Sequence, residues 1–228
     1  MIDVCYLKLY CTCMLSCASI YSIEVQTVAP MTDDEAKILH MVKINRGIVT
    51  STQVTEAGIP RRCLGTMVHG GMLCKVERGV YTLPEIWEDE LHVLQYRFSK
   101  GIFSHETALY LHRLTENTPI RYTMTFPFGY NTGNVRKRGV VAKVANEETY
   151  ALGIMTVSSP GGNPIQVYDI ERTLCDMVRT RHKADIQVVN QAMRMYTVTR
   201  DKDIAKLMDY ADTLRVKPKV LTYMEILL

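Results

Sequence analysis

The alternation of apolar and polar positions after residue 30 predicts a first helix. Thr32 and Glu35 have the spacing of a capping box, in which each side chain bonds the other residue's backbone N–H. Gly47 is a suitable residue to end the helix. The apolar residues recur at helical spacing, so that most of them share one face. They are Ile38, Leu39, Met41, Val42 and Ile44.

Two shorter helices are expected next, because the apolar residues now come in small groups. Ser51 or Thr52 can cap the first of them. Pro60 has no backbone N–H to lose at a first helical position, so it is expected to start the second. That helix runs to about His69, where Gly70 and the following glycine stop it.

A β-hairpin completes this segment. Met72–Val76 and Val80–Leu83 alternate in the manner of strands, and Glu77-Arg78-Gly79 between them favours a tight turn. The order of helix, short strand, helix, turn, helix and hairpin predicts a winged helix-turn-helix domain over residues 31–84.

Residues 85–228 mix both periodicities, which predicts an α+β domain with a small sheet and a carboxy-terminal helical cluster. The segment Phe128–Gly139 is rich in Gly, Asn and basic residues and is expected to be an exposed loop. Expected helices are Glu85–Lys100, Ser104–Leu114, Ile170–Arg179 capped by Asp169, Ala184–Tyr196, Asp201–Leu214 and Pro218–Leu228. Expected strands are Tyr122–Phe126, Val140–Val144, Ala151–Val157 and Pro164–Tyr168.

Composition adds little to this picture, since 47% of the residues are hydrophobic and the formal net charge is only +3. The cysteines have neither a disulfide framework nor zinc-ligand spacing, so no metal and no cofactor are expected. We interpret Cys63, Cys74 and Cys175 as small, mostly buried thiols in a reducing cytoplasm. The other four, all near the amino terminus, are Cys5, Cys11, Cys13 and Cys17.

Residues 1–30 are an unassigned extension. Their uncharged run, Thr12–Ile23, is too short to span a bilayer, and Lys8 preceded by Asp3 makes a poor signal-peptide start. The segment is either a weak signal or true extension, or it precedes a real start at Met31 or Met41. We favour the second interpretation and expect a cytoplasmic protein without a membrane span.

The distribution of charge points to DNA. Arg61 and Arg62 stand at the start of the expected third helix, where a recognition helix meets base edges. Arg78 at the wing tip and Lys75 add charge that can reach phosphates. The alternative is a solvated helix face on a module that docks protein. The candidate DNA-binding residues are Ser51, Thr52, Arg61, Arg62, Thr66, His69, Lys75 and Arg78.

No complete catalytic constellation is present, so the chain is not expected to be an enzyme. His105-Glu106 would need a second histidine at position 109 for zinc, and that residue is Leu109. Arg172 and Asp176 are four residues apart, a spacing typical of a structural ion pair along a helix.

Several stretches together resemble the antitoxin of AbiE-type systems (abortive infection, type IV toxin–antitoxin). They are the winged-helix region with its wing Gly71–Tyr81, the segment Phe103–Leu109 and the segment Tyr168–Asp176. The resemblance covers the chain from about Asp33 to its end. It implies a phage-defence regulator that represses its own operon at inverted repeats. Two repeats would require two modules about one DNA turn apart, supplied by a homodimer or by two monomers that bind cooperatively, and we expect a monomer or weak homodimer.

The resemblance also implies that residues 85–228 oppose a nucleotidyltransferase toxin, without requiring a stable complex. A protein-binding adaptor whose winged helix does not bind DNA is the alternative function. The candidate antitoxin surface comprises His105, Glu106, Arg136, Lys137, Arg138, Arg172 and Asp176.

Overall fold

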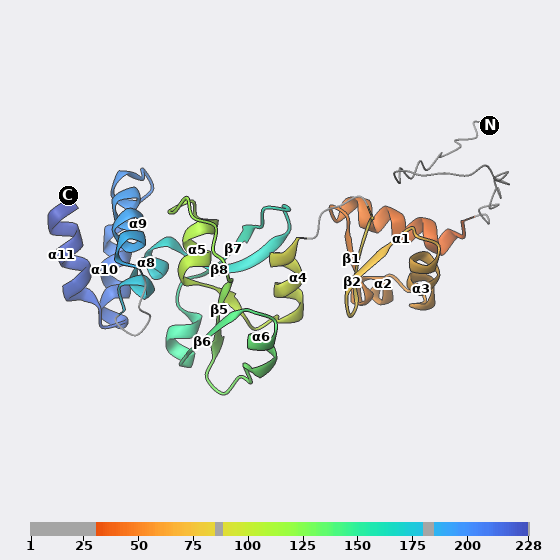
Figure 1. Ribbon diagram of the computed structural model, residues 1–228, viewed down its shortest axis with the longest axis horizontal. Coiled ribbons are helices and arrows are strands. Elements are labelled where there is room, and N and C mark those ends of the chain that lie inside the picture. The colour runs from red at the N-terminus through yellow and green to blue at the C-terminus, as the bar shows by residue number, and fades with distance from the viewer. Residues whose placement is uncertain (1–30, 85–88, 180–184, 228) are drawn as a thin grey trace, which may run out of the picture. The chain divides into compact units, whose positions relative to one another are not determined.

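The computed structural model describes residues 31–84, 89–179 and 185–227 (Figure 1). We call residues 31–84 the amino-terminal part and the other two ranges the carboxy-terminal part. The expectations for residues 1–30, for the start of the helix at Glu85 and for Leu228 lie outside the described residues.

The amino-terminal part combines three helices with a small antiparallel sheet. Its strands are ordered β1-β3-β2, so that β3 is central. Its elements are α1 (Asp33–Ile44), β1 (Ile48–Thr50), α2 (Ser51–Glu56), α3 (Arg62–His69), β2 (Cys74–Glu77) and β3 (Val80–Thr82).

Two expected helix starts are wrong by one or two residues. The cap of α2 is Thr50 rather than Ser51 or Thr52. Thr50 Oγ1 accepts the Gln53 N–H at 3.2 Å, while Gln53 Oε1 accepts the Thr50 N–H at 2.9 Å. Helix α3 begins at Arg62 rather than Pro60, because the preceding turn is closed by tighter bonds between residues three apart, such as Cys63 N–H to Pro60 O.

The core of this part forms where one face of each helix meets the sheet. The exception to the expected apolar face is Ile44, which is 66% exposed at the end of α1. The buried cluster consists of Ile38, Val42, Val49, Val54, Ile59, Leu64, Met67 and Leu73.

The carboxy-terminal part is built on a five-stranded mixed sheet ordered β6-β5-β4-β8-β7. Strands β4 and β8 are parallel, as are β5 and β6, whereas the other two pairings are antiparallel. The strands are β4 (Ile102–Phe103), β5 (Thr123–Pro127), β6 (Val141–Ala145), β7 (Ile154–Ser158) and β8 (Pro164–Tyr168). The helices are α4 (Glu90–Arg97), α5 (His105–Leu111), α6 (Gly133–Lys137), α7 (Glu147–Ala151), α8 (Ile170–Val178), α9 (Ile186–Val198), α10 (Ile204–Thr213) and α11 (Lys217–Leu227).

Two hydrophobic cores organise this part. One lies on the sheet, where Phe103, Met124 and Val167 are covered by residues of α4 and α6. The other lies among α5 and α8 to α11, around Leu174 and Leu207, and these last four helices are seen together in blue tones in Figure 1. The mixed α+β class expected from the sequence is therefore confirmed. Among the described residues, no helix is long and apolar enough to cross a membrane.

Short elements account for several of the differences from the expected pattern, and other elements differ only in their bounds, such as α10, which was expected at Asp201–Leu214. Strand β4 and helices α6 and α7 were not expected. Asn146 Oδ1 accepts the Thr149 N–H and caps α7, so β7 starts at Ile154 rather than Ala151. Helix α6 interrupts the expected loop Phe128–Gly139 because Val135 is buried in the sheet core.

Candidate nucleic-acid interface

Helix α3 has two chemically distinct faces. Leu64 and Met67 are buried, at 1% and 0% exposure, in the core of the amino-terminal part. The opposite face is exposed and carries the polar residues expected there. Its exposed residues are Arg61 at the cap position, Arg62, Gly65, Thr66 and His69.

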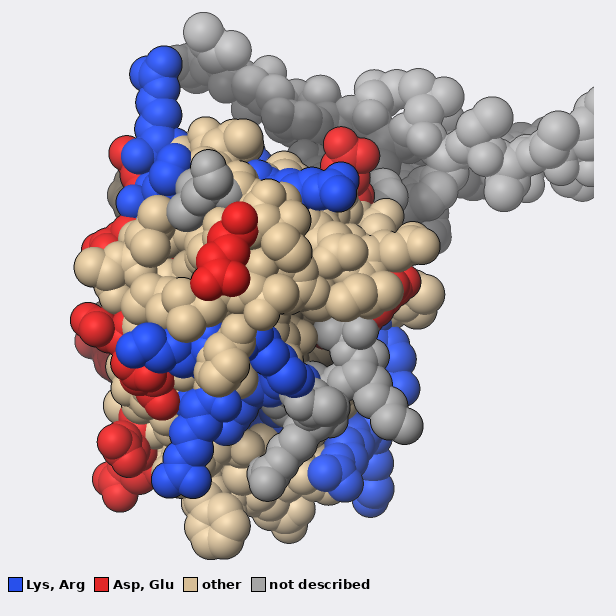
Figure 2. Space-filling view, turned by 90° about the vertical axis from the view of Figure 1, so that its left-hand side faces the viewer, with Lys and Arg blue, Asp and Glu red and all other residues tan. Residues whose placement is uncertain are grey.

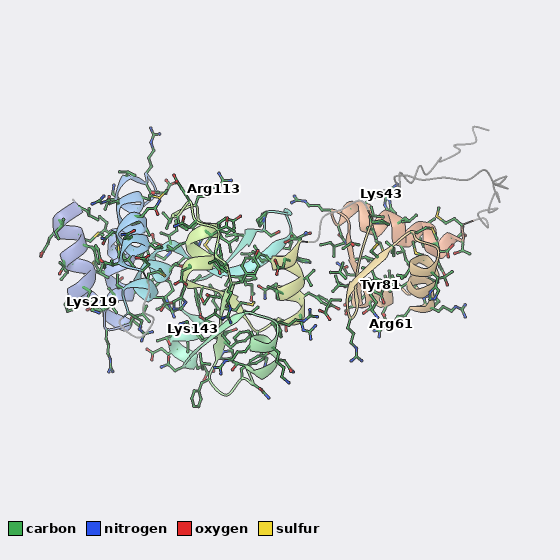
Figure 3. The ribbon with its side chains drawn as sticks, viewed as in Figure 1. Lys43, Arg61, Tyr81, Arg113, Lys143 and Lys219 are labelled. Atoms are coloured by element: carbon green, nitrogen blue, oxygen red, sulfur yellow. The ribbon has the colours of Figure 1, made fainter. Side chains whose placement is uncertain are left out.

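Arg61 is held by a neighbouring helix. Its Nε donates to Thr55 Oγ1 at 2.7 Å, and Thr55 Oγ1 in turn donates to the Ser51 carbonyl at 2.8 Å. These bonds engage one of the five guanidinium N–H groups, and four remain for a further acceptor. Arg61, labelled in Figure 3, therefore starts α3 as a partly ordered cation on the surface.

The remaining polar side chains of this face mostly bond their own helix. Thr66 Oγ1 donates to the Arg62 carbonyl at 3.3 Å, and His69 Nδ1 lies 3.0 Å from the Gly65 carbonyl. These contacts position both side chains along α3. The Arg62 side chain makes no hydrogen bond or ion pair within the described residues, which leaves its whole guanidinium available.

The hairpin is tied to the start of α2. The Ser51 N–H donates to the Gly79 carbonyl at 2.8 Å, and Gly79 has φ 83°. A Cβ at position 79 would lie 2.8 Å from Ser51 Oγ, so the turn needs glycine both for its conformation and for this close approach. Ser51 is half-buried and Thr52 exposed in the first turn of α2.

The hairpin adds two exposed cations. Lys75 lies on β2 opposite Tyr81, which Figure 3 labels, and Arg78 lies in the turn. Together with Arg61 and Arg62 they make four exposed cations on α3 and the hairpin. Exposed cations of this kind suit the phosphates of a nucleic acid better than they suit an apolar protein surface.

The candidate antitoxin surface is only partly a surface. His105 is 3% exposed, and its Nδ1 lies 3.1 Å from Ser104 Oγ, which also accepts a hydrogen bond from Thr125 Oγ1 at 2.8 Å. The expected surface role of His105 is therefore wrong, because its ring packs inside the fold. Its neighbour Glu106 is half-buried in the first turn of α5.

Arg172 and Asp176 are also buried rather than exposed. Their side chains are 1% and 4% exposed and form the expected ion pair, with Nε and Oδ2 2.9 Å apart. The Arg172 guanidinium also lies over the Tyr168 ring and donates to the Leu152 carbonyl at 3.2 Å. These contacts serve folding, and they cannot present either side chain to a partner.

The helix that contains this pair begins as expected. Asp169 Oδ1 accepts the Arg172 N–H at 2.8 Å, and its Oδ2 lies 2.9 Å from Lys206 Nζ. Lys206 also lies 3.2 Å from Glu171 Oε2, so one cation joins α10 to both acids of α8.

Three expected surface cations are confirmed as exposed. Arg136 and Lys137 lie in the last turn of α6, and Arg138 follows directly after it. They remain candidates for phosphate or protein contacts.

The cysteines fit their expected role incompletely. Cys175 is fully buried in α8, and this burial raises the pKa of its thiol to about 12. Cys63 is half-buried, whereas Cys74 is exposed on β2, so its expected burial is wrong. The edge position of β2 explains this exposure. Within the described ranges, no group of three or more metal-ligating side chains comes together.

Comparisons with known proteins place the chain in no family. No family model matches it, and no curated protein does. Among solved structures it is similar to the crystal structure of the RV2827C protein from Mycobacterium tuberculosis. The two share 10% sequence identity with a TM-score of 0.48, over 86% of this chain and 82% of that chain. A likeness this distant supports no argument about function.

Gly65 is a feature of this face that the sequence pattern did not single out. A Cβ added there would meet no heavy atom within 4 Å. Glycine is unfavourable in a helix interior, and packing within the chain does not require it here. Helical spacing alone places it on the polar side of α3, between Arg62 and His69, but only the structure shows that a side chain there would be unobstructed.

Proposed function

We propose that the chain is a DNA-binding transcriptional regulator whose amino-terminal part acts as a winged helix-turn-helix. The observation that carries this proposal is the segregation of α3 into a buried apolar face and an exposed face with Arg61 and Arg62 at its start. Recognition helices offer their first residues to base edges, and arginine can bind guanine through two hydrogen bonds. Lys75 and Arg78 on the hairpin would contact adjacent phosphates.

We further propose, from the resemblance to AbiE-type antitoxins, that this regulator is cytoplasmic, represses its own operon and opposes a nucleotidyltransferase toxin. Arg136, Lys137 and Arg138 are the residues of the candidate antitoxin surface that are exposed. Co-expression with the neighbouring gene tests this role. Growth rescued by the wild-type chain and lost when all three cations are replaced by alanine would support it.

DNA binding is tested with the full chain and its own upstream promoter, titrated with salt and with random DNA as competitor. Arg61→Ala and Arg62→Ala should each cost about 1–3 kcal/mol of specific binding if each side chain contacts a base. Arg78→Ala should weaken binding to all sequences alike and lower the salt slope by about 1.

The matched control for these variants is Arg194→Ala, which removes an exposed arginine from α9. It should leave promoter binding unchanged. A triple variant at Arg61, Arg62 and Arg78 that binds the promoter as the wild type does would refute the assignment of the site. Failure of the wild-type chain to bind at low salt would overturn the regulator itself.

A further inference from the structure

A cleft of about 810 Å³ lies in the carboxy-terminal part, where the end of β6 and the start of α7 face the connection between α10 and α11. Small-molecule sites typically occupy about 300–1,000 Å³, so this cleft has the size for a nucleotide. Its wall includes Asn146, Glu148 and Thr149 on one side. Thr213 and the α10–α11 connection form the other side.

Three cations line this cleft. They are Arg179, which follows α8, Arg215, between α10 and α11, and Lys219, in the first turn of α11. Glu148 is the one acid among the lining residues. Lys219 Nζ donates to the Val178 carbonyl at 3.3 Å, a contact that holds this side chain beside the end of α8. The cleft thus carries an excess of positive charge from separate elements.

The acid nearest to Arg179 does not balance this charge. Asp176 Oδ2 already bonds Arg172 Nε at 2.9 Å, and Oδ1 lies 3.7 Å from Arg179 Nη1. Lys143 on β6 adds a further positive charge in the field of the same carboxylate. Three cations therefore share one buried acid. An anion in the cleft would neutralise the positive charge that this acid leaves unbalanced.

Figures 2 and 3 show the charged side chains of the carboxy-terminal part from two directions. Figure 2 looks onto the end that carries α11, where several Lys and Arg side chains gather across the middle and lower half of the face. Figure 3 labels Lys143 on β6 and Lys219 on α11, and both lie on the lower side of the carboxy-terminal part in that view.

The backbone at Arg215 supports a role for its side chain. Arg215 has φ 56°, a left-handed conformation that residues with a Cβ seldom adopt, and Gly or Asn would fit it better. Its neighbours Leu214 and Val216 are 2% and 6% exposed and hold the connection in place. The chain thus keeps an exposed arginine at a position where local conformation favours other residues.

We propose that this cleft binds a ligand of nucleotide size through a phosphate group. The planar guanidinium group of arginine can donate two hydrogen bonds to phosphate oxygens, and the lysine ammonium group adds a positive point charge. This site is separate from α3 and the hairpin, so it stands whether or not the proposed promoter binding holds.

The test is calorimetric titration of ATP into the full chain carrying Arg61→Ala and Arg62→Ala, which removes the proposed promoter-binding cations. Arg215→Gly deletes a cleft charge at a position that glycine accepts, and Lys219→Gln deletes a second. Each substitution should weaken ATP binding by about tenfold, the loss expected for one charged hydrogen bond. Arg215→Asn should behave as Arg215→Gly does.

The control is Lys217→Ala. Lys217 lies two residues from Lys219, is paired with Asp212 at 2.5 Å and does not line the cleft. It should leave ATP binding unchanged, and thermal unfolding should show that all variants remain folded. Loss of binding in Lys217→Ala equal to the loss in Lys219→Gln would overturn the proposal, because it would indicate binding to general surface charge.

A second titration distinguishes the source of the phosphate. A twelve-nucleotide single-stranded RNA of mixed sequence replaces ATP, with the same variants. If ATP binds and the RNA does not, the ligand is a free nucleotide. If the RNA binds more tightly than ATP and Arg215→Gly weakens RNA binding, the ligand is the phosphate backbone of a strand. If neither probe binds at low salt, or if both bind equally well to Arg215→Gly and Lys219→Gln, the cleft is not a phosphate site.

Discussion

Replacing Gly65 with alanine separates the stability of α3 from its proposed contact with DNA. Glycine in a helix interior is less favourable than alanine by about 0.8–1.0 kcal/mol, since it loses more backbone freedom on folding. No steric clash opposes this gain in stability, because the added Cβ meets no heavy atom within 4 Å. Gly65→Ala should therefore stabilise the fold by about 1 kcal/mol.

Urea unfolding of the full chain, followed by circular dichroism, measures this gain as a raised midpoint with an unchanged slope. Gly101→Ala provides the contrast. A Cβ at position 101 would lie 2.6 Å from Met124 Cε and 2.8 Å from Phe126 Cζ. Overpacking of this kind costs about 1–3 kcal/mol, so this variant should lower the midpoint. A destabilised Gly65→Ala would show that the described environment of α3 is wrong.

Promoter binding by variants at the same position then tests function. If the exposed face of α3 enters a groove, a larger side chain at position 65 stands between the helix and the DNA. Gly65→Gln should weaken promoter binding more than Gly65→Ala, although neither removes a charge. Equal promoter affinity for the wild type and Gly65→Gln would refute the argument that glycine is there for close approach.

Three further predictions concern the carboxy-terminal part. Asp176→Asn should destabilise the fold by about 3–5 kcal/mol in urea unfolding, because it leaves the buried Arg172 without its charge partner. With peptide mass mapping, a thiol reagent should label Cys74 in the native protein and Cys175 only after unfolding, since burial raises the pKa of Cys175 to about 12. Burial lowers the pKa of His112 below its ordinary 6.5, so the unfolded state binds the proton more readily and stability should fall as pH drops below about 6.5. His112→Gln should flatten this dependence, and an unchanged slope would contradict the assignment.

The longer elements could be predicted because their own sequences carry the signal. Strand β8 matches its expected bounds at Pro164–Tyr168, and Asp169 caps α8 as expected. In both cases the periodicity or the capping residue lies inside the element itself. The α+β class follows from the sum of such local signals.

Short elements escaped prediction because distant contacts create them. Strand β4 has only two residues, and it exists because Phe103 pairs with both Met124 and Val167. Helix α6 depends on Val135 packing into the sheet core. No window of sequence contains these partners, so periodicity alone favoured a loop.

The same distinction between local and distant contacts explains which residues of the candidate site could be predicted. Arg61, Arg62 and Arg78 were predictable because adjacent residues of one short segment present them together. His105 looked like a surface residue, yet its bond to Ser104 and its burial depend on the sheet behind it. The assignment of residues 31–84 as a winged helix-turn-helix and the domain boundary at residue 84 stay predictions.

The cleft could not be predicted from the sequence for a related reason. Lys143, Arg179, Arg215 and Lys219 are spread over the 77 residues from position 143 to position 219, and each alone looks like an ordinary surface cation. Only the packing of α8, α10 and α11 brings the last three to one cleft, with Asp176 beside Arg179. A local run of cations such as residues 136–138 can be explained as one solvated segment of the surface. A charge excess that is assembled from separate elements is harder to explain in this way. For that reason the phosphate titration is as informative about this chain as the promoter assay.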